Sequence, residues 1–539
     1  MTASLATPRA GSAVTGTPPL LRASIKHDGR RFVPWIALAT ALSVSSVLIY
    51  AVVFPTQEER LALAGAISAN PALGLIFGPA YNLLTADGFN AWRSLALGGF
   101  LAGLGVIFLV TRATRAQEDS GQAELLASGV MGRSARLLTA VCMGLAGSAL
   151  LGVVVFLATV LSGGSWEPSL LLAATMTATG WMFTGVAAVT AQVGSEARMS
   201  SSLAVGALGV MFLLRGFAYA VEAPAWTVWS NPLGWMTETE PAYTNTWWPL
   251  LLAVVLTVLL LVAAFWLQAR RDFGVGAIPP TPGPARGVTR STSQLAWRIN
   301  RGPAVTWAIA FVALGFVFGY FTTSVNDILA SDPTVQQFLA SGAVNGESLI
   351  SAFLVTILSL VGILAAVPGV QVMTKLRAEE MDDRVEPVMA TATARPRYFG
   401  SNVAIALIGP AAYVLIAGTL IAVLASTADI GITFGDALLQ AAATVPAVWT
   451  VVAFAVAVIG ARPQLSLATW VGVVASFVLT ILGPTFDLPS WALAISPFWH
   501  VPNVTTPNPE WIGLIWISLV TAVFLAVGFS GFRRRDLAR

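Results

Sequence analysis

The charged residues that could carry chemistry gather in two short segments of the sequence that share one pattern. In each segment an arginine stands three residues before a glutamate, and a second glutamate follows six residues after the first. Such charges either keep a solvated helix out of the lipid or contact a partner protein, and their repetition favours a contact. The matching residues are Arg115, Glu118, Glu124 and Arg133 in the first segment, and Arg377, Glu380, Glu386 and Arg395 in the second.

Signatures of catalysis are scarce in this chain. The sequence holds two histidines, His27 and His500, and a single cysteine, Cys142. It contains no HExxH, Gly-x-Ser-x-Gly or GxxxxGK[ST] pattern, and one cysteine allows neither a disulfide nor a cysteine metal site within the chain. We therefore predict a protein that is not an enzyme, with no catalytic residue, no metal site and no cofactor of its own.

Hydropathy indicates which elements must position the charged segments. Of the 539 residues, 56% are hydrophobic and 10% are charged, and the mean hydropathy is +0.77. A soluble chain carries about 25% charged residues, so most of this surface must face lipid. Apolar runs long enough to cross a bilayer as helices predict twelve spans, at Pro34–Phe54, Ser94–Val110, Leu137–Leu161, Ser169–Val193, Leu203–Tyr219, Pro249–Trp266, Val305–Phe321, Leu349–Val372, Val403–Ala425, Ala437–Ile459, Leu465–Leu482 and Trp511–Phe529.

The basic residues indicate how these spans are oriented. Every Lys and Arg except Arg60, Arg93 and Arg215 falls on one side of the predicted layout. The positive-inside rule assigns that side to the cytoplasm. We therefore predict a multi-pass protein of the plasma membrane with both termini cytoplasmic.

The sequence is an internal duplication. Segments match at nearly constant offsets of 262 to 265 residues, as where Arg270-Arg271-Asp272 recurs as Arg534-Arg535-Asp536. Because six spans per half is an even number, both halves have the same orientation. The predicted fold is an all-α polytopic membrane protein with two tandem six-helix halves in parallel orientation.

The same pattern predicts the domain boundaries. A basic, partly apolar stretch precedes each half, at Leu20–Lys26 and Leu295–Arg301, which is typical of a short interfacial helix. We predict a cytoplasmic tail with such a helix at 1–33, a first six-span half at 34–266, a Pro-rich cytoplasmic linker with a second such helix at 267–302, and a second half with a basic tail at 303–539.

Arg215 is the one clear ionisable residue inside a predicted span, near its outer end. The free-energy cost of placing its charged side chain in the membrane must be compensated by other contacts. Glu222, seven residues on, lies on about the same helical face, whereas the second half has Thr480 and Asp487 at these positions. A structural pair at the outer gate of the first half is our interpretation, with cargo contact and snorkelling as alternatives. The predicted outer structural residues are Glu222, Trp226, Asp487 and Trp491.

The first charged segment resembles the cytoplasmic loop of ABC-2 type permeases. Its pattern, Arg-x-x-Glu-x-x-Gly-x-x-Glu-Leu-Leu-Ala, runs from Arg115 through Gly121 to Ala127. The segments Ser230–Trp235 and Ser496–Trp499, before the last span of each half, are similar to the Ser-Pro segment of that family. The fused two-half form resembles the actinobacterial exporters of polyketide antibiotics, the tetronasin-resistance type.

This resemblance implies that a coupling helix in each loop contacts an ATP-binding subunit. Two copies of that subunit would bind one permease chain as a dimer and carry the ATP and Mg. The expected cargo is a hydrophobic or amphipathic, drug-like compound moved out of the cell through a central cavity of the permease. Membrane lipid is the other expected partner, and no nucleic acid is expected. The residues implied for coupling are Arg115, Glu118, Gly121, Glu124, Arg133, Arg377, Glu380, Glu386 and Arg395.

The family's arrangement also implies that the second, fifth, eighth and eleventh spans line the translocation path. Ordinary helix packing is the alternative interpretation for each apolar side chain there. The candidate path residues are Met211, Phe212, Arg215, Phe217, Phe353 and Phe477.

The second loop departs from the family pattern. It has Asp383 where the first has Gly121, and Pro387 falls inside the expected coupling helix. Proline starts or breaks a helix. We therefore expect the two loops to engage a partner unequally.

Two other classes of protein stay open. Parallel six-plus-six repeats also occur in secondary transporters, although ion coupling usually needs carboxylates or histidines inside the spans. An integral-membrane enzyme acting on lipid-linked substrates would use acidic residues converging at one membrane face, such as Glu58, Glu59 and Asp87.

Overall fold

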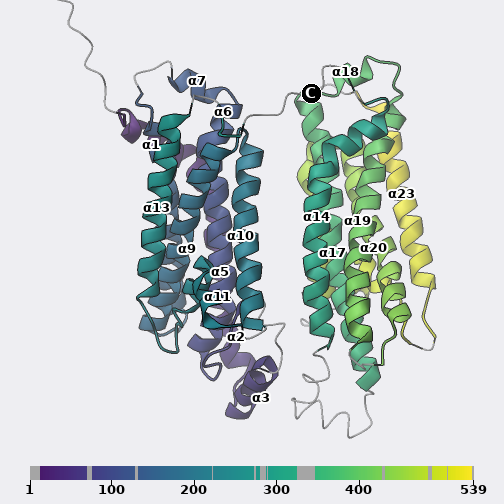
Figure 1. Cartoon of the computed structure of the whole chain (residues 1–539). Coiled ribbons are helices and arrows are strands. Elements are labelled where there is room, and N and C mark those ends of the chain that lie inside the picture. Colours follow the sequence, from purple (N-terminus) through teal and green to yellow (C-terminus); the bar gives the residue numbers. More distant parts are fainter. Residues whose placement is uncertain are drawn as a thin grey trace, which may run out of the picture. The chain divides into compact units, whose positions relative to one another are not determined.

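The chain folds entirely into helices and connecting segments over the residues that the structure describes, as a computed structural model (Figure 1). Twelve helices in these segments are long and apolar enough to cross a membrane. The predicted all-α fold with twelve spans is therefore confirmed. The structure describes residues 13–68, 76–127, 131–220, 223–271, 275–278, 287, 289–323, 346–427, 431–482, 489–506 and 508–536.

The chain separates into two compact units, Met1–Pro282 and Gly283–Arg539. Six of the twelve candidate spans lie in each unit. The division falls in the Pro-rich segment between the sixth and seventh spans.

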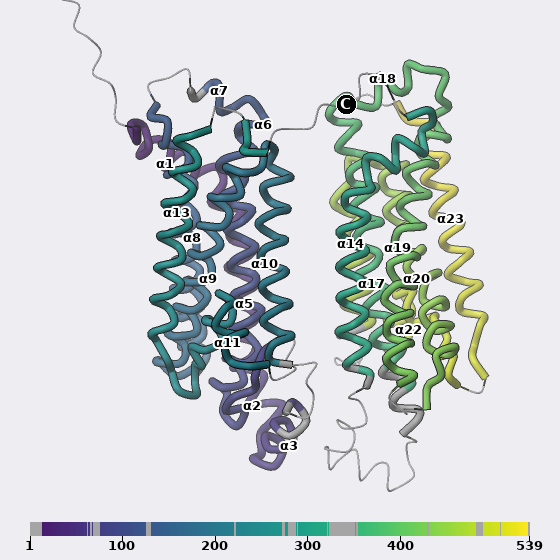
Figure 2. The backbone as a smooth tube through the Cα atoms, viewed as in Figure 1, coloured from purple at the N-terminus to yellow at the C-terminus, as the bar shows by residue number. Residues whose placement is uncertain are grey.

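The first unit packs around α5 and α9, the second and fourth spans. These two helices contact one another and also α2, α8 and α13 (Figure 2). Buried side chains such as Val106, Leu151 and Phe183 fill the interior. The longer helices of this unit are α1 (Thr17–Asp28), α2 (Val33–Val53), α3 (Gln57–Ser68), α5 (Ala86–Thr111), α8 (Ala135–Leu161), α9 (Trp166–Val193), α10 (Ala197–Ala220) and α13 (Pro249–Arg270).

Short helices occupy the two ends of this unit. At one end, α7 crosses the bundle, and the segments α11 and α12 precede the sixth span at the other end (Figure 1). Their bounds are η1 (Gly29–Phe32), η2 (Arg112–Ala116, a π-helical turn), α6 (Gln117–Asp119), α7 (Gln122–Ala127), α11 (Ala225–Trp229) and α12 (Pro232–Thr237).

The second unit packs around α20, which lies against α19, α17 and α23. Thr433 and Asp436 form a capping box at the start of α20, which satisfies backbone donors that the helix leaves free. A Cβ atom on Gly460 would lie 2.2 Å from the carbonyl oxygen of Gly528, so this glycine allows α20 and α23 to cross at backbone contact. The longer helices are α14 (Thr292–Thr323), α17 (Gly346–Met381), α19 (Arg395–Ser426), α20 (Phe434–Ala461) and α23 (Ile512–Arg534).

The fifth span of the second unit is the least regular of the twelve. It consists of a 3-10 segment, a short α-helix and a π-helical turn rather than one long helix. Its bounds and those of the short segments are η3 (Pro463–Trp470), α21 (Val471–Phe477), η4 (Val478–Leu482), α18 (Glu386–Met389), α22 (Ser490–Leu493) and η5 (Pro497–His500).

The spans extend further than hydropathy alone predicts. The second span was expected at Ser94–Val110, whereas α5 begins at Ala86, where the side chain of Thr85 caps the helix. Asn90 in the added first turns is buried and bonds Ser43. Of the two basic stretches, the first forms the separate helix α1 and the second is the start of α14, a helix that continues through Pro303.

Candidate functional site

The charged segment of the first unit is folded inward onto the ends of three spans. Glu118, in α6, binds three arginines through its two carboxylate oxygens. The shortest contacts are 2.6 Å to Arg115, 2.5 Å to Arg136 at the start of α8, and 2.9 Å to Arg271 after α13. The carboxylate is almost fully buried, with 5% of the side chain exposed. The glutamate therefore joins three helix ends.

Arg115 is the innermost member of this cluster. Its side chain has no exposed surface, because the π-helical turn η2 directs it into the bundle. Besides Glu118, its guanidinium donates to the carbonyl oxygens of Ala191 at 2.5 Å and Val275 at 3.4 Å. All three nitrogens have a partner, as a buried guanidinium requires.

The second unit repeats this arrangement with fewer arginines. Glu380, at the end of α17, bonds Arg377 at 3.0 Å and Arg535 at 2.6 Å, with 1% of its side chain exposed. Tyr398 occupies the position that matches Arg136. Its side chain bonds the neighbouring Glu379 instead.

In each cluster a further arginine side chain donates a hydrogen bond to a backbone carbonyl oxygen. Arg133 donates to the carbonyl oxygen of Arg271 at 2.5 Å, and Arg395 donates to that of Arg535 at 2.8 Å. We call Arg115, Glu118, Arg133, Arg136 and Arg271 the first latch, and Arg377, Glu380, Arg395 and Arg535 the second latch. In both units the latch fixes the loop after the second span to the end of the sixth.

Beyond each latch the chain turns and presents a short helix to solvent. The turn uses a left-handed residue in both units, Gly121 at φ +74° and Asp383 at φ +57°. Asp383 therefore adopts the same left-handed backbone conformation as Gly121, although it departs from the family pattern. This conformation costs free energy in Asp383 because a side chain disfavours it. Glu124 in α7 and Glu386 in α18 follow and are exposed.

The nine predicted coupling residues thus fall into three groups. Six of them are members of the latches, and Gly121 makes the turn. Only Glu124 and Glu386 are exposed on short helices. Pro387 stands in the first turn of α18 and so starts this helix rather than breaking it. The assignment of all nine to partner contact stays a prediction.

Sequence reasoning missed two members of the first latch, Arg136 and Arg271. The signal was present for one of them, because the pair Arg270-Arg271 recurs as Arg534-Arg535 beside the last span of each half. That repetition reflects a shared partner, the latch glutamate, as well as a shared ancestry.

Arg215 is buried, with 1% of its surface exposed, near the C-terminal end of α10. Its guanidinium donates to the carbonyl oxygen of Ile76 at 2.6 Å and lies 4.7 Å above the ring of Phe212. Its buried Nε has no hydrogen-bond partner among the described residues, so the guanidinium is only partly satisfied there. Glu222, its predicted partner, lies outside the described residues, and so does Asp487. At the matching place in the second unit Thr480 bonds Ser496 at 2.7 Å.

Two loops pack together beside Arg215 at this end of the unit. Tyr219 donates to Glu238 at 2.6 Å, and the rings of Tyr81 and Tyr243 stack at 5.0 Å. Burial, reinforced by the nearby carboxylate of Glu240, raises the pKa of Tyr81 above its ordinary value. The region is therefore a packed polar cap over the end of α10.

The remaining predicted residues differ in exposure. Met211 and Phe212 pack against the core of the first unit, whereas Phe217 and Phe477 are exposed. The side chain of Phe353 lies outside the described residues. Trp226 and Trp491 are both exposed at matching positions in α11 and α22, which is typical of tryptophans at a membrane interface.

The twelve apolar helices define the chain as a multi-pass membrane protein. The segment 290–533 matches a family model described as "Multidrug efflux system permease Rv1217c, C-terminal domain". Over its length the chain is 33% identical to the multidrug efflux system permease protein Rv1217c of Mycobacterium tuberculosis, covering 98% of this chain and 97% of that protein. The chain belongs to the family of this efflux permease.

Proposed function

We propose that the chain is the membrane permease of an ATP-driven exporter of the ABC-2 type. A separate ATP-binding subunit would dock as a dimer, with one copy on the α7 loop and one on the α18 loop. The observation that carries this proposal is the latch in each unit. It holds an exposed short helix in a fixed position against the ends of the spans.

The latch supplies a mechanical link between a docked partner and the spans. A force on α7 reaches α5 through the short turn at Gly121 and reaches α13 through the ion pair of Glu118 with Arg271. A loop tethered only by its backbone would absorb the same force. ATP and Mg belong to the partner in this proposal, and its ATP-driven closure would move the loops and switch access to the path.

The cargo in this proposal is a hydrophobic or amphipathic drug-like compound that leaves the cell. The relative of M. tuberculosis is described as a multidrug efflux system permease, which supports efflux of more than one compound. Resemblance to exporters of polyketide antibiotics supports the same chemical class. The plasma membrane with both termini cytoplasmic is the location that the basic residues favour.

Purification of the chain with and without its ATP-binding partner tests the proposal. ATP hydrolysis should be absent from the chain alone and appear in a complex with two ATP-binding subunits per chain. Drug-like compounds should then stimulate hydrolysis. Hydrolysis of ATP by the isolated chain, or a complex with one ATP-binding subunit per chain, would contradict the proposal.

A further inference from the structure

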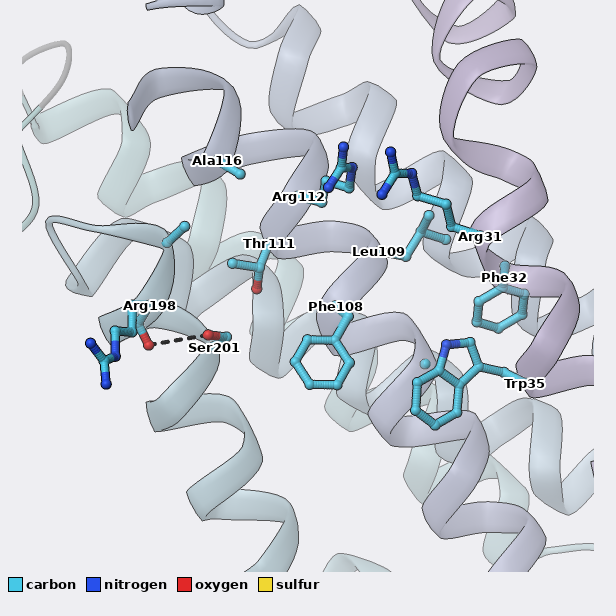
Figure 3. Close-up of a pocket in the computed structure, with 12 residues that line it drawn as sticks. Arg31, Phe32, Trp35, Phe108, Leu109, Thr111, Arg112, Ala116, Arg198 and Ser201 are labelled. Carbon is cyan, nitrogen blue, oxygen red and sulfur yellow. Dashed lines mark hydrogen bonds between the residues drawn. The ribbon is translucent and has the colours of Figure 1, made fainter. Parts of the chain in front are cut away.

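The first unit contains a cavity of about 340 Å³ between the start of α2, the end of α5 and the start of α10. Arg31 and Arg112 lie together at one end of this cavity, and Arg198 lies at the opposite rim with its guanidinium turned outward (Figure 3). Phe108 and Trp35 lie next to each other below the arginine pair in this view (Figure 3). The residues that line the cavity include no latch residue and no candidate path residue, although α5 and α10 are two of the spans expected to line the path.

Three arginines and no acidic residue line this cavity, while Asp119 lies beside it and accepts from the backbone of Ala197 at 2.7 Å. Asp28 bonds both Arg31 at 3.3 Å and Arg112 at 2.9 Å, so two arginines share one carboxylate. No ion pair is found for Arg198 in the part of the chain that the structure describes. Arg31 and Arg112 are about half exposed, which leaves donors available for an anion.

Below the rim the wall is apolar. Phe108 is 45% exposed, and its ring lies 6.1 Å from that of Trp35. A Cβ atom on Gly105 would lie 2.7 Å from Cγ of Trp35, so this glycine provides the room for the indole. The hydroxyl of Thr111, buried at the wall, has no hydrogen-bond partner among the described residues. A ligand for this site thus combines an anionic head with an apolar body.

The wall continues into the lipid-facing surface of the first span. Val33 and Leu38, on either side of Trp35 in α2, are 55% and 54% exposed. In a spanning helix such exposed aliphatic residues face acyl chains. The cavity also lies at the end of the unit predicted to be cytoplasmic, where anionic lipids attract basic residues.

The second unit contains a cavity of about 390 Å³ between α14, α17 and α19, so it shares the first and second spans as walls but has the third span in place of the fifth. Trp307, Gln371 and Thr374 are part of its lining. Thr374 stands where the first unit has Arg112. The ammonium group of Lys375 donates to the carbonyl oxygen of Ile299 at 2.9 Å. This second cavity has similar size without the pair of arginines at its rim.

We propose that the first cavity is a binding site for an anionic phospholipid of the cytoplasmic leaflet. Arg31 and Arg112 hold the phosphate of its headgroup, and its acyl chains lie over Trp35 and Phe108 toward the outer face of α2. The bound lipid thus contacts the first unit at a specific place on its surface, and occupancy of the site depends on the content of anionic lipid in the membrane. This inference is independent of the energy source proposed above.

Native mass spectrometry of the full chain in detergent measures the first lipid-binding event directly. The probes are dioleoyl phosphatidylglycerol, dioleoyl phosphatidylcholine, glycerol 3-phosphate and dodecyl phosphate. The test variant is Arg31→Gln/Arg112→Gln, and the matched control is Arg298→Gln/Arg301→Gln, which removes two exposed arginines near the start of α14. If the test variant fails to fold, Arg112→Thr replaces it, because threonine stands at that position in the second unit.

Phosphatidylglycerol should bind the unaltered chain at least about tenfold more tightly than phosphatidylcholine. The test variant should lose roughly thirtyfold in affinity, since each basic residue at an anionic surface contributes about 1 kcal/mol, and the control should change less than about twofold. Equal binding of the two lipids, or an equal loss in the control, would overturn the proposal. Tighter binding of glycerol 3-phosphate or dodecyl phosphate than of phosphatidylglycerol would assign the site to a soluble anion and also overturn it.

Discussion

Glu118 and Arg271 lie 153 residues apart in the sequence, and their side chains meet at 2.9 Å at one end of the first unit. Glu380 and Arg535 make the matching contact in the second unit at 2.6 Å. A buried carboxylate is tolerated only when it is paired and fully hydrogen-bonded. The repeated latch therefore explains why these charges recur at one spacing in a chain with so few of them.

Replacement of Glu118 by alanine should destabilise the first unit. The change leaves the buried guanidinium of Arg115 without its carboxylate, which costs about 3–5 kcal/mol and lowers the Tm by roughly 5 °C or more. Thermal unfolding of the detergent-solubilised chain, followed by tryptophan fluorescence, measures this. The control Glu124→Ala alters an exposed residue six positions away and should stay within about 0.5 kcal/mol. Equal melting of the two variants would mean that the latch does not contribute to stability.

Gly121→Ala should cost about 1–2 kcal/mol, because the left-handed backbone at this turn disfavours a side chain. No atom lies within 4 Å of the added Cβ, so the cost is conformational rather than steric. Gly206→Ala is the opposite control: it lies inside α10 with open space around it, and alanine should stabilise the helix by about 0.5–1 kcal/mol. The same unfolding measurement compares both variants, and a stable Gly121→Ala would contradict the role of the turn.

Arg215→Gln should lower both stability and export. The loss of its bond to the carbonyl of Ile76 should cost about 1–3 kcal/mol, since a buried acceptor is left without its donor. Arg93→Gln is the control, because that arginine is only half-buried in the second span and contacts Ser46 at 3.4 Å. Efflux of a fluorescent substrate from cells with matched expression gives the second measurement. Unchanged efflux and melting in Arg215→Gln would contradict a structural role.

Charge reversal at the exposed glutamates tests the docking proposal separately from stability. Glu124→Lys should lower substrate-stimulated ATP hydrolysis of the complex more than Glu386→Lys does, because α7 keeps the full family pattern. Both variants should melt within about 1 °C of the unaltered chain, as exposed surface changes usually do. Equal hydrolysis by both variants and the unaltered complex would show that these helices do not contact the partner.

The sequence alone was sufficient to predict the helical class and all twelve spans, since an apolar run of the right length has few other structures available. It was not sufficient for the environment of the charged residues. Hydropathy places Glu118 in a cytoplasmic loop but carries no information about whether the loop folds back. The buried position of Glu118 depends on its ion pairs with Arg136 and Arg271, which lie 18 and 153 residues away in the sequence.

The same limit applies at the other end of the first unit. Helical periodicity pointed from Arg215 to Glu222, seven residues away on the same helix. Glu222 lies outside the described residues, and the partner that the structure shows for Arg215 is the backbone of Ile76, 139 residues earlier. A carbonyl acceptor has no signature in a sequence, because every residue supplies one. The sequence therefore predicts that a buried polar side chain requires a hydrogen-bond partner, but it does not predict which residue supplies that partner.

The latch also sets an order for the biogenesis of each unit. At a synthesis rate of about 5–20 residues per second, Arg271 emerges roughly 8–30 s after Glu118, and Arg535 follows Glu380 after a similar delay. During that interval the glutamate has only its near neighbours, and the loop must wait at the membrane surface while four further spans are inserted. The ion pair of the latch can therefore form only after the arginine that follows the last helix of the unit has been synthesised. Insertion of that last helix is the step after which the loop can adopt its final position.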